Sequence, residues 1–276
     1  MSVSEKSTLI KRVLTAVIML PILIAAIFWL PLLYFALILG SLILVGAWEW
    51  SALVGLTKTS FRILYVFLIA VGIFISAFIN IAWTLSVAGV CWLWILMGII
   101  HYQRNGLGAG FQFPAVRFLV GFPVLIATWV SMVALKSHPG FGAPWLLLVL
   151  CIIFAADTGA YFAGRFFGKR FLCSRVSPKK TWEGFFGGLI FSLCVAAIGG
   201  YYFALLPQQY LYLMLVAVAT ILFSVVGDLG VSLLKRIAGV KDSGQLFPGH
   251  GGMLDRLDSV AAATVFFVLI ALWVGS

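Results

Sequence analysis

The chain has 276 residues, of which 63% are apolar and only 9% are charged, and its formal net charge is +10. Its mean hydropathy of +1.16 excludes an ordinary soluble domain, because an apolar composition of this kind indicates a membrane protein. A basic chain can also bind nucleic acid. Here the basic residues are dispersed between apolar segments, so we expect no nucleic-acid partner.

Apolar segments recur along the chain, and each is close to the ~20 residues that a helix needs to cross ~30 Å of hydrocarbon. Unbroken apolar runs favour helices over a β-barrel, whose strands alternate in polarity. The sequence therefore predicts an all-α, polytopic integral membrane protein with about nine transmembrane helices, at residues 12–29, 31–47, 63–79, 82–100, 117–135, 144–163, 185–205, 210–227 and 259–275.

The basic residues predict the orientation of these segments. If the N-terminus is cytoplasmic, all but one of the 18 Lys and Arg residues fall in cytoplasmic connections, and only Lys136 falls on the other side. Cytoplasmic loops carry an excess of Lys and Arg, which also attract anionic lipid headgroups. We therefore expect a protein of the cell (inner) membrane with its N-terminus in the cytoplasm.

Acidic residues divide the chain into two halves. Residues 1–150 contain Glu5 and Glu49, whereas residues 151–276 contain the other six of the eight acids. This distribution predicts an N-terminal transmembrane scaffold over 1–150 and a C-terminal transmembrane catalytic half over 151–276, with its active site at the cytoplasmic face.

Asp157 lies within the sixth predicted segment, among the small residues Ala155, Ala156 and Gly159. An ionisable side chain in a membrane segment is a candidate functional residue, and small neighbours allow close packing of helices or close approach of a ligand. A structural ion pair with Arg165 or another basic residue is the alternative interpretation.

The segment SRVSPKKTWEG places Lys179, Lys180 and Thr181 where a helix is expected to begin. Backbone N–H groups and the positive end of the helix dipole favour a phosphate at such a position. Glu183 can cap this helix or balance the lysines. The alternative is a positively charged loop that holds lipid headgroups.

Three further carboxylates flank the last connection of the chain. Asp228 ends the eighth predicted segment, while Asp255 and Asp258 open the ninth at a spacing that puts both on one helix face. Carboxylates gathered in one place repel one another unless a cation neutralises them, and Mg²⁺ prefers such oxygen ligands. The residues predict a metal-assisted phosphate site, although a structural network of ion pairs would contain similar residues.

The glycines of PGHGG let backbone N–H groups approach a ligand closely. His250, which lies among them, can donate to a phosphate or hold the loop by hydrogen bonds.

Three motifs occur in order between Ser232 and Asp258: S-x-x-K-R, K-D-S-G and P-G-H-G-G-x-x-D-R-x-D. Together with the earlier DTGAY and SPKKTWEG segments, they resemble the signature of the CDP-diacylglycerol synthases (phosphatidate cytidylyltransferases). The likeness covers the second half of the chain well, and the first half only as a pattern of hydrophobic segments. No charged or glycine position of the signature departs from the family pattern.

The resemblance implies that CTP and phosphatidic acid react at the bilayer to give CDP-diacylglycerol and pyrophosphate. It implies Mg²⁺ as cofactor, with K⁺ as a second cation, held by Asp228 and Asp255 with Asp258 as a further ligand or a supporting acid. Lys235 and Arg236 would act with these acids in catalysis. The residues expected to bind the substrates are Asp157, Ser177, Lys179, Lys180, Ser232, Lys241, His250 and Arg256. Polar groups on membrane helices permit a homodimer without requiring one.

Two other functions fit parts of the pattern. A CTP-dependent kinase of a polyprenol or similar lipid alcohol would use the same nucleotide and metal but transfer the γ-phosphate. A transporter would carry ionisable groups near the bilayer midplane, whereas most charges here lie at the ends of segments.

Overall fold

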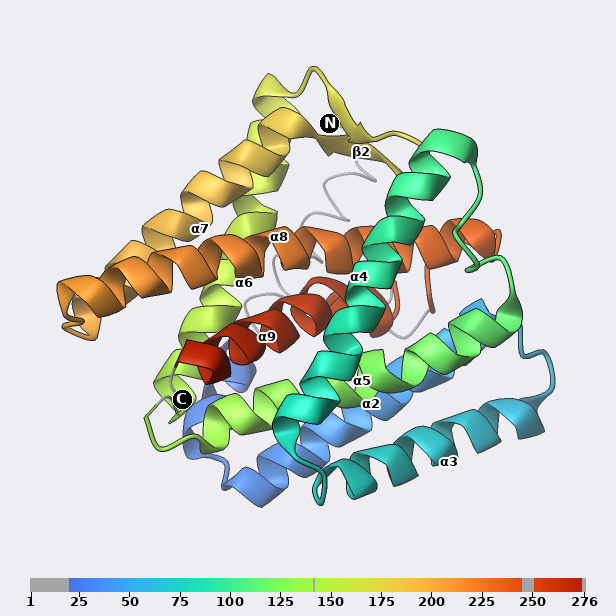
Figure 1. The fold of residues 1–276 in the computed structure, drawn as a ribbon, viewed down its shortest axis with the longest axis horizontal. Helices are drawn as coiled ribbons and strands as arrows, with labels where there is room; N and C mark the ends of the chain where they lie inside the picture. Colours follow the sequence, from blue (N-terminus) through green and yellow to red (C-terminus); the bar gives the residue numbers. More distant parts are fainter. Residues whose placement is uncertain (1–19, 141, 245–250, 275–276) are drawn as a thin grey trace, which may run out of the picture.

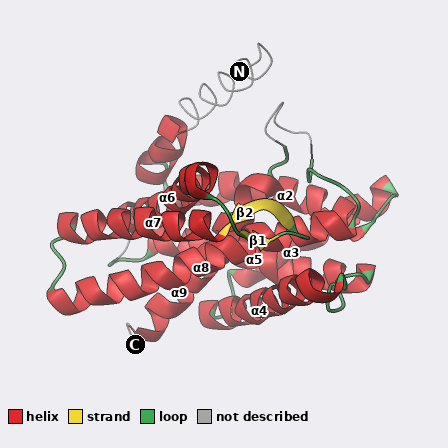
Figure 2. Ribbon diagram, turned by 90° about the horizontal axis from the view of Figure 1, so that it is seen from above, coloured by secondary structure: helices red, strands yellow, loops and turns green. Residues whose placement is uncertain are grey.

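A computed structural model describes residues 20–140, 142–244 and 251–274, and most of them are helical (Figure 1, Figure 2). A short helix, Leu20–Trp29, precedes the numbered elements. The numbered helices are α2 (Leu32–Val54), α3 (Thr59–Ser76), α4 (Ile81–Asn105), α5 (Pro114–Ser137), α6 (Gly142–Phe167), α7 (Trp182–Tyr202), α8 (Pro207–Ile237) and α9 (Leu254–Val274).

Seven of the described helices, α2 to α8, are long and apolar enough to cross a bilayer. They coincide with the second to eighth predicted segments, and α9 coincides with the ninth. The first predicted segment lies partly outside the described residues, and its described part is helical. The all-α polytopic class is therefore confirmed, while the count of nine spans stays a prediction.

Helix α8 continues past its predicted end at residue 227 to Ile237. Its extension is held by packing, since Leu233 and Leu234 are buried and Gly230 approaches Ile95 of α4. Because the helix continues, Asp228, Ser232 and Lys235 recur at the spacing of a single helix face. That face contributes to the charged cavity described below.

A two-stranded antiparallel hairpin, β1 (Phe171–Cys173) and β2 (Ser177–Thr181), joins α6 to α7. The predicted helix start is confirmed at Thr181, whose side chain accepts a hydrogen bond from the backbone N–H of Gly184 at 3.1 Å. Lys179 and Lys180, however, lie on the strand before it. Proline is tolerated in an edge strand, and Pro178 occupies such a position in this two-stranded ribbon.

Helices α6 and α7 pack along each other through small residues. A Cβ atom at Gly188 would lie 2.6 Å from the carbonyl oxygen of Ala156, and one at Gly159 would lie 2.8 Å from that of Gly187. Such close backbone approach is the usual reason for small residues between membrane helices. The packing therefore supports the structural interpretation of the small residues around Asp157.

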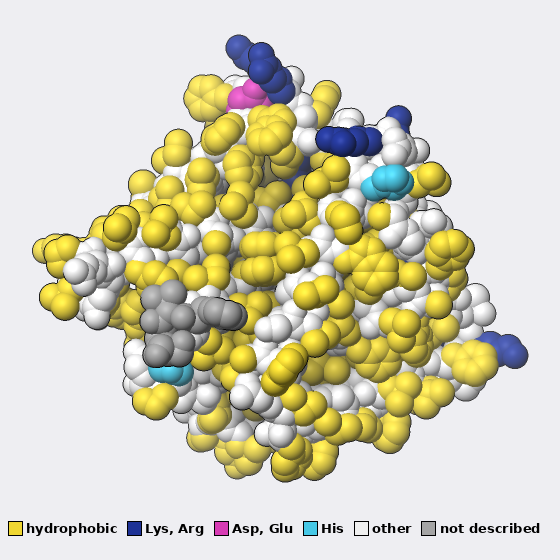
Figure 3. All heavy atoms as spheres, viewed as in Figure 1, with side chains coloured by type: hydrophobic (Ala, Val, Ile, Leu, Met, Phe, Trp, Pro, Cys, Tyr) yellow, Lys and Arg dark blue, Asp and Glu magenta, His cyan; other side chains and the backbone are white. Residues whose placement is uncertain are grey.

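Helix α9 lies at the centre of the fold and contacts α2, α4, α5, α6 and α8 (Figure 1). Ala262, Ala263 and Val265 of α9 are fully buried. The face seen in Figure 3 is mostly apolar, and the Lys and Arg side chains visible there lie mainly near its rim. The middle of α9 is thus enclosed by the other helices, while Asp255 and Asp258 at its start are partly buried.

Candidate active site

A cavity of about 510 Å³ brings together charged residues from α6, β2, α8 and the start of α9. Among the described residues that line it are Asp157, Ser177, Lys179, Lys180, Asp228, Lys235, Asp242, Asp255 and Asp258. A larger cavity of about 650 Å³, next to Trp145 and Phe203, has no Asp, Glu, Lys or Arg among the described residues of its lining. The smaller cavity is therefore the candidate site for phosphate chemistry.

Asp228 on α8 is paired with the hairpin. Its Oδ2 lies 2.6 Å from the Lys180 ammonium, and its Oδ1 accepts a longer hydrogen bond, 3.4 Å, from the Ser232 hydroxyl. Ser232, placed among the substrate-binding residues, thus acts on Asp228 from the next turn of the helix. The side chains of Lys180 and Asp228 are 26% and 29% exposed, so water and ligands can reach the pair.

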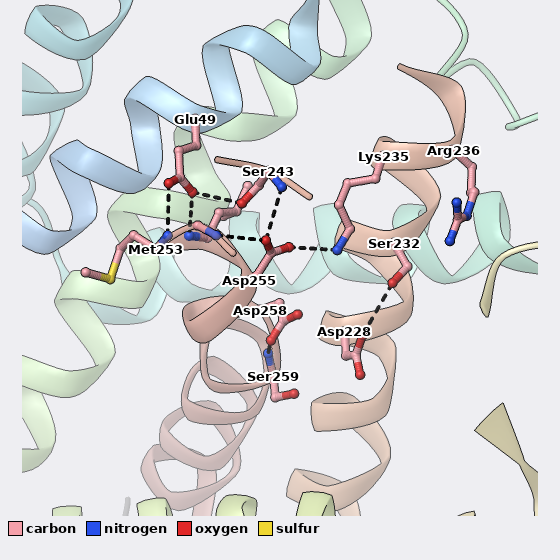
Figure 4. A network of polar contacts seen from close by, with 12 residues as sticks. Glu49, Asp228, Ser232, Lys235, Arg236, Ser243, Met253, Asp255, Asp258 and Ser259 are labelled. Atoms are coloured by element: carbon pink, nitrogen blue, oxygen red, sulfur yellow. Dashed lines mark hydrogen bonds and ion pairs between the residues drawn. The ribbon is translucent and has the colours of Figure 1, made fainter. Parts of the chain in front are cut away.

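Asp255 in the first turn of α9 makes more polar contacts than Asp228 does (Figure 4). Its Oδ1 accepts from the Lys235 ammonium at 2.7 Å, and its Oδ2 accepts from the backbone N–H groups of Ser243 and Gly252, each at 3.1 Å. The side chains of Lys235 and Asp255 are each 13% exposed. This carboxylate therefore stabilises the start of α9 while it faces the cavity.

Asp258 lies one turn further along α9 and points toward α8 (Figure 4). Gly227 allows this approach, because a Cβ atom there would collide with the carbonyl oxygen of Asp258. The Asp258 carboxylate is close enough to those of Asp228 and Asp157 for their negative charges to repel, and Lys180 attracts it. The structure thus adds Asp157 to the expected group of acids, while Asp255 faces Lys235.

Several expected phosphate ligands lie elsewhere. Arg236 is exposed, and its Nε donates to the carbonyl oxygen of Val176 at 3.2 Å, which holds the turn of the hairpin against α8. Lys241 and Arg256 are exposed and do not line the cavity as the structure describes it. His250 lies outside the described residues.

Gln103 at the end of α4 holds the other side of the hairpin. Its Oε1 accepts from the backbone N–H of Arg175 at 2.9 Å, and its Nε2 donates to the Ser174 hydroxyl at 3.2 Å. Glu183 does not pair with the lysines of β2 but accepts from the backbone N–H groups of Lys169 and Arg170 at 3.0 and 3.2 Å. The hairpin that carries Lys179 and Lys180 is thus fixed by polar contacts on both sides.

The sequence alone indicates no role for Glu49 or Asp242. Asp242 lines the cavity. Glu49 on α2 is 5% exposed and bonds to the start of α9 (Figure 4). The available signal for Glu49 was a carboxylate within an otherwise apolar segment, which is unusual enough to indicate a specific partner.

The donor atoms around the cavity suit Mg²⁺, because all the acids supply hard carboxylate oxygens. No group of three or more His, Cys, Asp or Glu side chains in the described part of the chain is arranged to hold a metal ion. Mg²⁺ does not require such a group, since one or two carboxylates with water and substrate phosphate complete its shell. The repulsion among Asp157, Asp228 and Asp258 is the feature that a bound cation would relieve.

Fold and cavity together define a polytopic membrane protein with paired acids and lysines suited to binding a metal and phosphate groups. The sequence model of the cytidylyltransferase family matches residues 10–273. The chain belongs to this family.

Named relatives agree with this membership. The phosphatidate cytidylyltransferase of Pseudomonas aeruginosa is 37% identical over 268 residues, which cover 95% of this chain and 96% of the relative. That of Haemophilus influenzae is 37% identical over 278 residues, covering 93% and 96%. The Bacillus subtilis protein of the same name is 40% identical over 160 residues, covering 56% of this chain and 59% of the relative.

Proposed function

We propose that this protein is a phosphatidate cytidylyltransferase, which converts CTP and phosphatidic acid to CDP-diacylglycerol and pyrophosphate in phospholipid biosynthesis. The observation that carries the proposal is the match to bacterial phosphatidate cytidylyltransferases along nearly the whole chain. The cavity supports it, because it combines lysines for phosphate groups with carboxylates for a cation at the edge of apolar helices.

The reaction joins two anions. A phosphate oxygen of phosphatidate attacks the α-phosphorus of CTP in line with the departing group, a new P–O–P bond forms, and the bond from the α-phosphorus to the β-phosphate oxygen breaks. Pyrophosphate leaves with that oxygen. Phosphatidate carries its own nucleophile, so the protein needs to supply position and positive charge. Lys179, Lys180 and Lys235 supply the charge in the cavity.

Asp228 and Asp255 would hold Mg²⁺, with Asp258 as a further ligand and K⁺ as a second cation. When bound, Mg²⁺ would neutralise the triphosphate and stabilise charge on pyrophosphate. The pairs Lys180–Asp228 and Lys235–Asp255 fit this arrangement, since each lysine can turn to a phosphate when its carboxylate turns to a cation. The two ion pairs thus keep both kinds of charge in the cavity.

We further propose that the cavity faces the cytoplasm from the cell (inner) membrane. Lys136, the one basic residue expected on the other side, donates to the carbonyl oxygens of Ala26 and Leu30, just before the start of α2. Glu49 and the cavity lie toward the opposite end of α2. Phosphatidate would reach the site from within the bilayer, because removing an acyl chain costs ~0.8 kcal/mol per CH₂ group.

Product analysis tests the function. The purified protein is incubated with CTP, phosphatidate and Mg²⁺, and the lipid and water-soluble products are identified. CDP-diacylglycerol and equimolar pyrophosphate support the proposal. CDP with a phosphorylated lipid alcohol, formed when a polyprenol replaces phosphatidate, would indicate the kinase instead. Movement of a solute across proteoliposomes without consumption of CTP would indicate a transporter.

A further inference from the structure

Glu49 belongs to α2, in the first half of the chain, yet its carboxylate contacts the segments that carry the candidate catalytic acids. We propose that Glu49 is a positioning residue, which holds Ser243 and the start of α9 so that Asp255 and Asp258 face the cavity. The inference rests on the function proposed above and assigns the scaffold half a direct part in building its site.

Three hydrogen bonds connect Glu49 with residues about 200 positions later (Figure 4). Its Oε2 accepts from the Ser243 hydroxyl and from the backbone N–H of Leu254, both at 2.8 Å, and its Oε1 accepts from the backbone N–H of Met253 at 2.9 Å. The first N–H groups of a helix have no partner within it, and negative charge is favourable there. Glu49 therefore caps α9 from another helix.

Ser243 links Glu49 to Asp255. Its hydroxyl donates to Glu49, while its backbone N–H donates to Asp255. Asp255 also accepts from the N–H of Gly252, next to Met253. The two carboxylates thus hold the same short stretch of backbone from opposite sides, and a displacement of this stretch would move Asp255 and, one turn later, Asp258.

Two glycines of the signature pack directly on the Glu49 carboxylate. A Cβ atom at Gly244 would collide with it, and the three nearest atoms are all from Glu49. A Cβ atom at Gly252 would collide with both Glu49 oxygens and with the Ser243 hydroxyl. Neither glycine has a positive φ. Glycine is therefore required at these positions by the proximity of Glu49, not by the backbone conformation.

A double-mutant cycle tests this contact on the full-length protein in detergent, with no need for enzymatic activity. Gly244→Ala is made in the native chain and in the Glu49→Ala variant, and the midpoint of thermal unfolding is measured. We expect Gly244→Ala to lower the midpoint in the native chain and to cause no further loss in Glu49→Ala, because the colliding carboxylate is gone. Equal losses in both backgrounds would overturn the proposed contact.

Gly46→Ala is the matched control on α2. Its Cβ atom would lie 3.8 Å from the nearest side-chain atom, a Leu257 methyl group, which is an ordinary contact. We expect this substitution to change the midpoint of thermal unfolding only slightly, and by the same amount in the native chain and in the Glu49→Ala variant. A dependence on Glu49 as large as that of Gly244→Ala would count against the proposal.

Kinetics test the positioning role. Glu49→Gln keeps the size of the side chain but removes its charge, and kcat is measured per folded molecule after size-exclusion chromatography. We expect kcat to fall about tenfold or more with little change in KM. A displacement of catalytic groups by about 1 Å can lower the reaction rate by up to ~10²-fold. Asn80→Ala is the control, because the exposed Asn80 accepts from the backbone N–H of Ala82 at the start of α4 and does not line the cavity, and it should leave kcat unchanged.

A native kcat per folded Glu49→Gln molecule would overturn the positioning role. If the unmodified protein forms no CDP-diacylglycerol while the thermal cycle behaves as expected, the proposed function fails and the contact between α2 and α9 stands. The two hypotheses are thereby tested separately.

Discussion

Lys180 on β2 and Asp228 on α8 form an ion pair of 2.6 Å across the candidate active site. Lys180 belongs to the signature segment SPKKTWEG, whereas Asp228 ends the eighth predicted segment, and the pair brings the two residues to one cavity. The carboxylates of Asp258 and Asp157 lie close enough to this pair to interact electrostatically with Lys180 and with Asp228. The charge of Lys180 therefore acts on three carboxylates, one of them in a direct ion pair.

Replacing Lys180 should weaken substrate binding. In Lys180→Ala the cavity loses a cation that we expect to contact phosphate, and a hydrogen bond to a charged group contributes about 1.5–3 kcal/mol. We expect the apparent KM for at least one substrate to rise about 10- to 100-fold by this magnitude. Lys169→Ala, a basic residue outside the cavity lining, is the control. Unchanged kinetics in Lys180→Ala would favour a lipid-headgroup contact for this lysine.

Asp228→Asn should remove turnover while leaving the protein folded and inserted. The change keeps the size of the side chain but removes a proposed Mg²⁺ ligand. We expect the rate to fall more than ~100-fold, because replacing residues that merely support metal ligands already lowers metal affinity or activity by about 10- to 100-fold. The rate is measured over a range of Mg²⁺ concentrations. Activity close to that of the unmodified protein at saturating Mg²⁺ would contradict the metal assignment.

The Lys235–Asp255 pair should contribute to stability as well as to chemistry. Lys235→Met leaves the Asp255 carboxylate, only 13% exposed, without its cation, which we expect to cost about 1.5–3 kcal/mol of unfolding free energy. Asp255→Asn removes the same charge pair from the other side. The double variant should be more stable than the sum of the single losses predicts. Strict additivity, measured by unfolding in detergent, would show that the pair does not couple the two residues.

The orientation can be tested by cysteine labelling. Lys58 and Ala77 lie at opposite ends of α3, and single cysteines are placed there after Cys91, Cys151, Cys173 and Cys194 are replaced. In intact cells a membrane-impermeant maleimide should label Ala77→Cys, whereas Lys58→Cys should react only after the membrane is permeabilised. The reverse pattern would place the cavity on the outer side.

Much of the fold could be predicted from hydropathy alone. A helix that contacts lipid must keep its apolar residues continuous, so α2 to α8 are visible as segments. Hydropathy does not predict the end of α8, because the apolar run stops before the charge of Asp228 while the helix continues. The helix continues to Ile237 because one of its faces is buried against α4 while another carries the polar side chains.

The site was predictable only where its residues stand in recognisable local patterns. Asp228, Asp255, Lys179 and Lys180 belong to such patterns. Glu49 does not, because its role depends on contacts with Met253 and Leu254, more than 200 residues away in sequence. The contact of Arg236 with the hairpin backbone was equally invisible, since a carbonyl acceptor leaves no trace in the side-chain sequence.

The fate of a radioactive phosphorus atom distinguishes cytidylyl transfer by this protein from transfer of the γ-phosphate. The purified protein is given phosphatidate and Mg²⁺ with CTP labelled at either the α- or the γ-phosphate. Cytidylyl transfer predicts that the α-label enters the lipid and the γ-label leaves as pyrophosphate. Lipid that carries the γ-label, or no transfer of the α-label by well-folded protein, would contradict the account.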